Sequence, residues 1–449
     1  MSALAMLLIF VVAIVCMVVA IARFGVHPFI SILVTALVLA LALGIPLQTL
    51  PDTVGRGFSA IFTGIGLVII FGTLIGTILD KTGAAIAMAW AVDRTIGRRS
   101  PRLAMLLIGW IVSIPVFCDS GFVLVSPVSH SLATRSGQSP VTLTLALAAG
   151  LFASHVFIPP TPGPVAAAGL MGIDDNLLLV IALGVVVSLI SLIPAYFFAG
   201  RVGRKVQPAQ VQPSSSPTEA SGVPALAAFM PILVPVLLMA VASVVALTGA
   251  TGMWATLLTF LGKPFVALMI ATACCLPLLA RRGMMSQTYD ITQQSLMTAG
   301  PIIFITAAGS VLGTVIADSG FVNVIKEHCG TLSALGMAFP FIIAAVLKSA
   351  QGSSTVAITT TAGIMGMYSD SGSMMASLGY TSPLAAALVV MAIGAGAMTV
   401  SHANDSYFWV VTGMGGIRPG DGYRTVTLMT LFMGIAALAA ILLAAAILL

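Results

Sequence analysis

Long apolar runs, separated by short polar stretches, recur from one end of the chain to the other. A helix of about 20 mainly apolar residues crosses a hydrocarbon core of about 30 Å, so these runs predict membrane-spanning helices. The clearest predicted spans are Leu4–Ala22, Phe29–Leu43, Ala60–Leu79, Leu177–Ala199, Ala225–Leu247, Ala255–Ala280, Ala299–Ile316 and Val426–Leu449.

Composition indicates the same fold class. Of the 449 residues, 59% are hydrophobic and only 7% are charged, whereas soluble domains have about 25% charged residues. We therefore predict an all-α polytopic protein of the lipid bilayer. The first run has no basic region before it and no small-residue cleavage site after it, so we expect a permanent span and not a signal peptide. The five cysteines show no metal-ligand spacing, and no metal or other cofactor is predicted.

The chain divides into two similar halves. Residues 201–224, rich in Pro, Ser and Gln, predict a cytoplasmic linker between a first membrane repeat (1–200) and a second (225–449). IGTILDKTG at 75–83 matches LGTVIADSG at 312–320, and a Ser-His pair at 154–155 matches one at 401–402, in the same order. Weak internal similarity of this kind is typical of transporters.

One segment in each half has an unusual length. Leu103–Thr134 has 32 residues and Leu332–Met367 has 36, which is too long for one helix and shorter than the roughly 40 residues that two full spans need. Each contains a polar tip, CDSG at 118–121 and QGSS at 351–354. We predict a re-entrant helical hairpin in each half, with its tip buried in protein.

A second unusual segment in each half is predicted to be one helix broken near its middle. These segments are Pro140–Gly172 and Ser382–Gly416. The prolines between residues 159 and 164 cannot continue a helix, and residues 403–406 are poor helix formers at the matching place.

The positions of the basic residues test this topology. If each broken helix crosses once and each hairpin returns to its own side, each repeat has about five crossings, and the odd number makes the repeats inverted. With the N-terminus outside, the inner loops then hold most of the 18 lysines and arginines, as the positive-inside rule requires. A hairpin leaves loop placement unchanged whether or not it spans fully, so only its length argues for re-entrance. The basic residues placed inside are Arg23, Lys81, Arg94, Arg98, Arg99, Arg102, Arg135, Arg201, Arg204, Lys205, Arg281, Arg282, Arg418 and Arg424. The net charge of +5 is therefore assigned to membrane orientation and not to nucleic-acid binding.

Hydrogen-bonding side chains gather at the predicted tips and breaks, most densely in SHANDSYFWV at 401–410. An aspartate at bilayer depth costs about 2.5–3.5 kcal/mol, so it tends to mark an ion, proton or substrate path. Half-helices that start after Ser120, Gln351 and Asp405 would offer free N–H groups to an anionic substrate. The predicted substrate-binding residues are Ser120, Gly121, Thr161, Gly163, Gln351, Gly352, Ser353, Ser354, Thr355, Asn404 and Ser406. The predicted proton-coupling residues are Asp119, Asp405, His155 and His402, and no catalytic or metal-binding residue is predicted.

Structural roles compete with these assignments. Asp405 is alternatively the N-cap of the helix that follows it, and both histidines are alternatively core residues with satisfied ring nitrogens. Lys348 either neutralises a substrate carboxylate or has a structural role, pairing with a core aspartate or extending toward the interface. The structural role is slightly favoured.

Four stretches resemble the gluconate permease family of gluconate:proton symporters, which lies within the ion-transporter superfamily. They are FCDSGFV at 117–123, PPTPGPVAAAG at 159–169, KSAQGSSTVA at 348–357 and SHANDSYFW at 401–409, and the resemblance extends over essentially the whole chain. It implies a multi-pass inner-membrane protein that imports gluconate or a related sugar acid with protons. The superfamily implies a homodimer and an elevator-like transport domain.

Other functional classes are less well supported. An intramembrane hydrolase would use Ser, His and Asp, but the sequence has neither a G-x-S-x-G nor an H-E-x-x-H motif. It also lacks the Walker A loop of an ATP-driven pump. Paired hairpins and broken helices favour alternating access over a channel. We therefore predict a transporter and not an enzyme, with another small hydroxylated carboxylate or an amino acid as the alternative substrate.

The charge distribution makes a direct prediction about topology. A reporter fused after Lys205 is expected to be cytoplasmic, and reporters fused after Asp175 or after Leu449 are expected to be external. Paired alkaline phosphatase and fluorescent-protein fusions measure this. A cytoplasmic reporter after Leu449 would contradict the inverted arrangement.

Overall fold

The computed structural model describes residues 3–97, 99–208, 222–248, 251–319, 335–402 and 405–449. These residues form helices and connecting loops, and no β-strand occurs among them. Arg98, most of the predicted linker and the start of the second predicted hairpin segment, at 332–334, lie outside the described residues. The predicted all-helical fold is confirmed.

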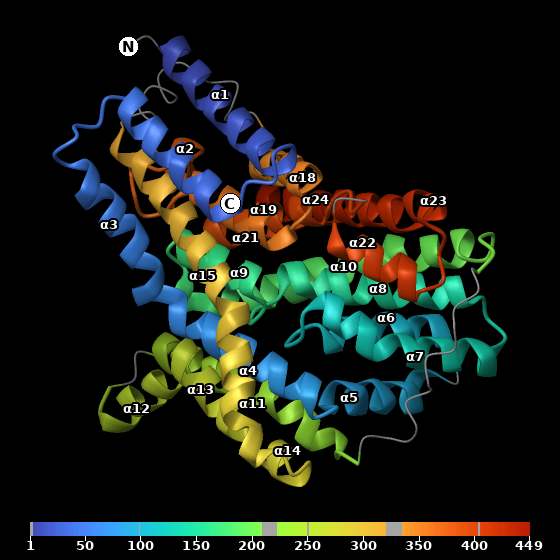
Figure 1. Cartoon of the computed structure of the whole chain (residues 1–449). Helices are drawn as coiled ribbons and strands as arrows, with labels where there is room; N and C mark the ends of the chain where they lie inside the picture. Colours follow the sequence, from blue (N-terminus) through green and yellow to red (C-terminus); the bar gives the residue numbers. More distant parts are fainter. Residues whose placement is uncertain (1–2, 98, 209–221, 249–250, 320–334, 403–404) are drawn as a thin grey trace.

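Figure 1 shows how the helices are arranged along the chain and in space. The first half contains α1 (Ala3–Ala22), α2 (Pro28–Ala42), α3 (Leu50–Ile61), α4 (Leu67–Lys81), α5 (Ala84–Val92), α6 (Pro101–Val112), α7 (Cys118–Ser136), α8 (Pro140–Phe157), α9 (Pro162–Leu170) and α10 (Leu177–Val202). The second contains α11 (Ala225–Leu247), α12 (Met253–Leu261), α13 (Pro264–Cys274), α14 (Leu276–Arg281), α15 (Thr288–Asp318), α18 (Ala338–Gln351), α19 (Ser354–Met365), α20 (Met374–Ser377), α21 (Pro383–Met398), α22 (Ser406–Met414), α23 (Pro419–Gly422) and α24 (Leu428–Leu448). Short π-helical turns precede α4 and α24 and follow α5.

All four predicted interruptions are breaks in the structure. They separate α6 from α7, α8 from α9, α18 from α19, and α21 from α22. Pro115 lies in the first break and Pro160 in the second, where a proline lacks the N–H that a helix needs. Gly352 ends α18 with a φ of +85°, a left-handed backbone that glycine adopts without steric cost.

Two predicted boundaries are wrong. The polar tip at 118–121 is the first turn of α7, and the chain bends earlier, at Ser113–Phe117, where Pro115 interrupts the helix. The predicted single span Ala255–Ala280 is divided into α12, α13 and α14. Lys263 is extended, with φ −61° and ψ 133°, because a residue before a proline avoids the helical region.

Six helical stretches in the described part of the chain are long and apolar enough to cross a membrane, and the α3–α4 pair, bent by 47°, is a seventh candidate. Shorter apolar helices, including α6, α18, α19 and α21, end at the breaks. The structure therefore has several full-length spans together with half-length ones, and the ten-crossing topology stays a prediction.

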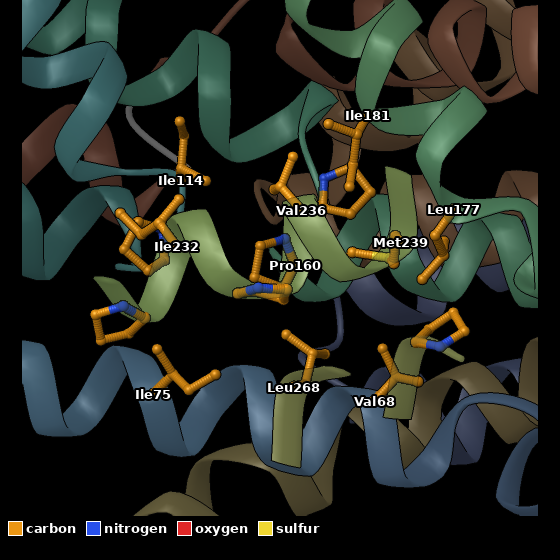
Figure 2. Close-up of a pocket in the computed structure, with 15 residues that line it drawn as sticks. Val68, Ile75, Ile114, Pro160, Leu177, Ile181, Ile232, Val236, Met239 and Leu268 are labelled. Carbon is orange, nitrogen blue, oxygen red and sulfur yellow. The ribbon is translucent and has the colours of Figure 1, made fainter. Parts of the chain in front are cut away.

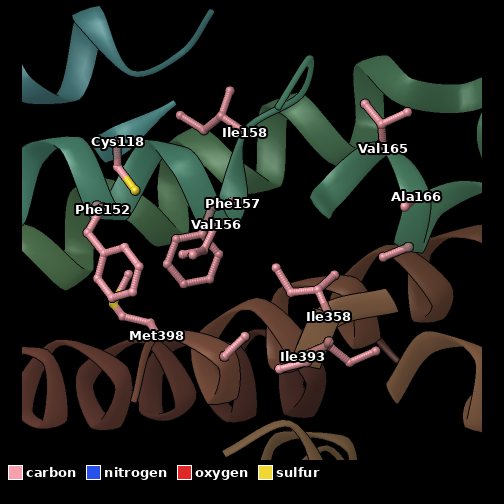
Figure 3. Close-up of a cluster of buried hydrophobic side chains, with 14 of the residues drawn as sticks. Cys118, Phe152, Val156, Phe157, Ile158, Val165, Ala166, Ile358, Ile393 and Met398 are labelled. Atoms are coloured by element: carbon pink, nitrogen blue, oxygen red, sulfur yellow. The ribbon is translucent and has the colours of Figure 1, made fainter. Parts of the chain in front are cut away.

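The broken helices of the two halves of the chain form the centre of the protein. Every residue of α8 from Val141 to Phe157 is buried, and so is every residue of α21 from Ala385 to Met398. Figure 3 shows Phe152 of α8 close to Met398 of α21 within one apolar cluster. Helices α10 and α24 pack against this centre, and the long α15 contacts α2, α3 and α4 on one side and α19 on the other.

Glycines allow the central helices to approach closely. A Cβ atom on Gly150 of α8 would lie 2.0 Å from the Leu106 carbonyl oxygen of α6. One on Gly363 of α19 would lie 2.3 Å from the Gly309 carbonyl oxygen of α15. Small residues at such crossings are typical of membrane helices that lack a hydrophobic driving force for association.

These crossings predict the effect of one added methyl group. Gly150→Ala is expected to lower the thermal unfolding temperature of the purified protein, because backbone atoms of α6 must move to admit the Cβ atom. Gly55→Ala is the matched control. Gly55 lies within α3 with no atom in the way of a Cβ, and alanine favours a helix over glycine by about 1 kcal/mol. Equal effects of the two changes would contradict this packing.

Candidate substrate and proton site

A buried ion pair joins two of the breaks. The Nζ atom of Lys348, in the last turn of α18, lies 2.6 Å from Oδ2 of Asp405, which precedes α22. The Lys348 side chain is 0% exposed and that of Asp405 is 6% exposed. Unpaired charges are very costly in such surroundings, so each group depends on the other. The alternative that Lys348 pairs with a core aspartate is confirmed.

Lys348 is held at the C-terminal end of its helix. Its Nζ atom also donates to the carbonyl oxygen of Gly352, which the left-handed turn brings back over α18. A cation at this position interacts favourably with the negative end of the helix dipole. The ring of Phe152 lies 5.6 Å from Nζ and adds a cation–π contact.

Asp405 is the N-cap of α22 and also the anion of the buried pair, and its predicted role in proton coupling stays a prediction. Its Oδ1 accepts from the Tyr407 backbone N–H at 3.1 Å, which makes it the N-cap of α22. Its Oδ2 accepts from Lys348 and from the Ser401 hydroxyl. The Tyr407 hydroxyl donates to the Ala148 carbonyl of α8 at 2.9 Å, which fixes the first turn of α22 against the other repeat.

The backbone at residues 400–402 is strained and tightly held. Val400 has a φ of +63°, a conformation that is a genuine outlier for a β-branched residue and costs about 1–3 kcal/mol. The adjacent Ser401 is fixed on both sides, since its N–H donates to Thr430 Oγ1 and its carbonyl accepts from Thr427 Oγ1. The Nε2 atom of His402 lies 3.1 Å from the Ser349 carbonyl of α18. These contacts maintain an irregular backbone at the ion pair.

The helix breaks in the first half of the chain lie near the Lys348–Asp405 pair. The ring of His155, at the end of α8, lies 5.9 Å from that of Phe117, which precedes α7. Nδ1 of His155 is buried and has no hydrogen-bond partner in the described protein. His155 interacts electrostatically with Lys348 and Asp405, and Cys118 does so with those two groups and Asp119. All four proton-coupling candidates therefore lie at or beside the breaks around one ion pair.

Several predicted substrate residues make contacts within the protein. Ser353 is the N-cap of α19, where its hydroxyl accepts from the Val356 N–H at 3.3 Å. The Thr161 hydroxyl donates to the Ile158 carbonyl at 2.5 Å. Gly121 packs against Leu151, and Gly163 against Ile358, with little room for a larger residue.

The structure describes only some of the remaining predicted substrate residues. Ser354 is buried and Thr355 is half-buried in the first turn of α19. The side chains of Ser120, Gln351 and Ser406 are outside the described structure, and Asn404 lies outside the described residues altogether.

Sequence reasoning missed four side chains of this site. Phe152, Thr427 and Thr430 lie in apolar runs, where nothing in the pattern separates them from ordinary core residues. Tyr407 lies in the polar stretch 401–410, two residues after the predicted cap Asp405, and that position was a usable signal.

Comparison with known proteins assigns the chain to a family. A family model described as "GntP family permease" matches residues 5–447. The chain belongs to this family. The resemblance identified from the four sequence stretches is thereby confirmed, and the protein is a multi-pass permease of the inner membrane.

Among similar proteins is the inner membrane permease YgbN of Escherichia coli (strain K12), 30% identical with 97% of each chain covered. The gluconate permease of Pseudomonas aeruginosa is 29% identical with 96% of each chain covered. Among solved structures, the Alcanivorax borkumensis YdaH transporter matches with a TM-score of 0.63 and 14% identity, over 94% of this GntP-family chain and 98% of that one. This last likeness shows a shared fold.

The ion pair predicts an asymmetry between single and double changes. Lys348→Met leaves the Asp405 carboxylate buried and unpaired, so the free energy of unfolding is expected to fall by about 3–5 kcal/mol. The double variant Lys348→Met/Asp405→Leu removes both charges and is expected to regain most of the lost free energy of unfolding. A deficit of about 1 kcal/mol is expected to remain because the N-cap is lost. Unfolding in detergent micelles measures both.

Lys205→Met is the control for loss of a lysine. Lys205 is exposed, so its replacement is expected to change stability by no more than about 0.5 kcal/mol. A double variant as unstable as Lys348→Met would show that the pair is not what holds the breaks together.

Proposed function

We propose that this permease is a symporter that imports gluconate or a related sugar acid together with protons by alternating access. The observation that carries the proposal is the buried Lys348–Asp405 pair at the meeting point of broken helices. A permease needs a site at membrane depth, and in this proposal that site contains the ion pair, a second carboxylate on Asp119 and several helix ends.

The charge balance of the site supports coupling to protons. The pair is neutral, so an anionic substrate alone would leave a net negative charge in surroundings of low dielectric. A proton that arrives with the substrate restores neutrality. In the proposed cycle, the substrate carboxylate takes the place of Asp405 beside the Lys348 ammonium, and Asp405 accepts the proton. Release of both on the inner side lets the pair form again.

Helix ends supply the remaining substrate contacts in this proposal. The N-termini of α7, α19 and α22 lie at Asp119, Ser354 and Ser406, and the partial positive charge of a helix N-terminus suits carboxylate and hydroxyl oxygens. His155, whose Nδ1 is buried without a partner in the described structure, offers a donor or acceptor to a sugar hydroxyl. A hydroxylated acid fits such a set better than an apolar acid does.

The gluconate permease among the relatives supports gluconate as substrate. Another small hydroxylated carboxylate or an amino acid is the second candidate, because Lys348 recognises a carboxylate whatever carries it. A homodimer with an elevator-like transport domain, and the inverted five-plus-five repeats, belong to the same proposal. The two helix interruptions found in each half of the chain support the repeats.

Asp405→Asn separates proton coupling from substrate binding. The amide keeps the shape but carries no proton through the cycle, and it leaves Lys348 without a carboxylate partner. Gluconate accumulation driven by a proton gradient is expected to be lost, while gluconate exchange between equal pools continues. Gluconate is also expected to raise the unfolding temperature of this variant more than that of the wild type, because it supplies the missing anion.

Uptake of labelled gluconate into proteoliposomes, with and without a protonophore, measures accumulation, and counterflow measures exchange. Ser353→Ala is the comparison variant, expected to weaken apparent affinity and to keep coupling. If Asp405→Asn and Asp119→Asn proteins both still concentrate gluconate against its gradient, the coupling assignment is wrong.

A further inference from the structure

Two adjoining cavities lie outside the ion-pair site. The wider one, of about 310 Å³, lies between the start of α10 and the helices α11, α12 and α13. Its lining includes the exposed residues Asp175, Thr259 and Lys263. The predicted topology puts this end of the protein on the outer side of the membrane. Because Asp175 and Lys263 place a negative and a positive charge at its wall, this wider cavity is suited to hold water.

The second cavity continues inward from the first. The two share Leu177, Met239 and Pro264 in their linings. Figure 2 shows side chains of α4, α11 and α13, among them Val68, Val236 and Leu268, directed toward Pro160 in the break between α8 and α9. The inner end of this cavity therefore lies against the breaks of the first repeat.

The inner cavity is narrow and dry. Its volume is about 20 Å³, close to the minimum that one water molecule needs. All of its lining residues are apolar, so a water there would lack hydrogen-bond partners. Six of them are prolines, which bring no backbone N–H either: Pro115, Pro159, Pro160, Pro231, Pro235 and Pro264. A polar solute cannot pass while these side chains are in contact.

The walls of the inner cavity are parts of the chain where helices are interrupted. Pro160 lies in a helix break, Pro115 lies in another, and α13 begins at Pro264. Pro231 and Pro235 each remove a hydrogen bond inside α11. Prolines weaken helices at defined places and allow them to bend there. The contact that closes the route is therefore made between segments that can change direction.

We infer that the two cavities form the outer access route to the site, and that side chains of α4, α11 and α13 close it against the breaks of the first repeat in this structure. The inference rests on the proposed transport function for the identity of the solute. It adds the path, the residues that close it, and the side of the membrane from which it opens.

Cysteine accessibility tests this route. In a protein without its native cysteines, single cysteines are placed at Thr259 in the wider cavity and at Leu268 in the dry cavity. A membrane-impermeant thiol reagent is applied from outside to right-side-out vesicles. Thr259→Cys is expected to react at once. Leu268→Cys is expected to react about 10- to 1,000-fold more slowly, because an open state populated at about 0.1–10% exposes it only for that fraction of the time.

Leu39→Cys is the matched control. Leu39 is a leucine as fully buried as Leu268, at 0% against 3% exposed, and it lies in α2 away from both cavities. It is expected not to react on this time scale. Val236→Cys provides a second position in the dry cavity, and labelling after denaturation shows that each cysteine is present.

Two outcomes would overturn the route. One is that Leu268→Cys and Val236→Cys react no faster than Leu39→Cys. The other is that they react only from the inner side. Neither measurement requires gluconate, so the route can fail while labelled gluconate is still taken up. The reverse outcome is also possible. If the cysteines react from outside in the expected order of rates but the protein does not transport gluconate, the route is supported and the proposed substrate is wrong.

Discussion

The buried contact between Lys348 and Asp405 is the interaction on which the central architecture depends. Neither charge is stable alone in a protein interior surrounded by lipid, and each lies at a helix end that the other helps to fix. The lysine closes the turn after α18 through Gly352, and the aspartate starts α22 through its cap. One ion pair thus sets the relative position of two helix interruptions that are more than fifty residues apart in sequence.

Around this pair, the protein maintains an irregular backbone where straight helices would be simpler. The left-handed Val400 is held because Ser401 on its far side bonds twice to residues that open the last helix. Tyr407 links α22 to α8 of the other repeat. The strain is local, while the hydrogen bonds that oppose it come from distant parts of the chain. This combination is typical of functional sites, where surrounding structure over-determines an unfavourable conformation.

Close helix packing and unfilled space occur in different parts of the same protein. Around Gly150 and Gly363 the helices approach until a single methyl group no longer fits, and α8 and α21 are buried along almost their whole length. Between α4, α11 and α13 and the first-repeat breaks, the contact is made by prolines and branched apolar side chains around unfilled space. The closely packed centre carries the charged groups, and the unfilled space lies between that centre and the helices around it.

The sequence by itself determined the helical membrane fold, the four interruptions and the cluster of polar groups at them, because apolar length, proline and glycine act locally on the backbone. It also raised the N-cap role of Asp405. Sequence did not determine that Lys348 is the partner of Asp405, that α7 begins at the polar tip, or that Ala255–Ala280 is three helices. Nor did it distinguish Thr427 and Thr430 from core residues. Those features depend on which segments meet in space: a lysine three residues from a tip has the same local pattern whether it faces substrate, lipid or an aspartate, and only tertiary packing chooses between them.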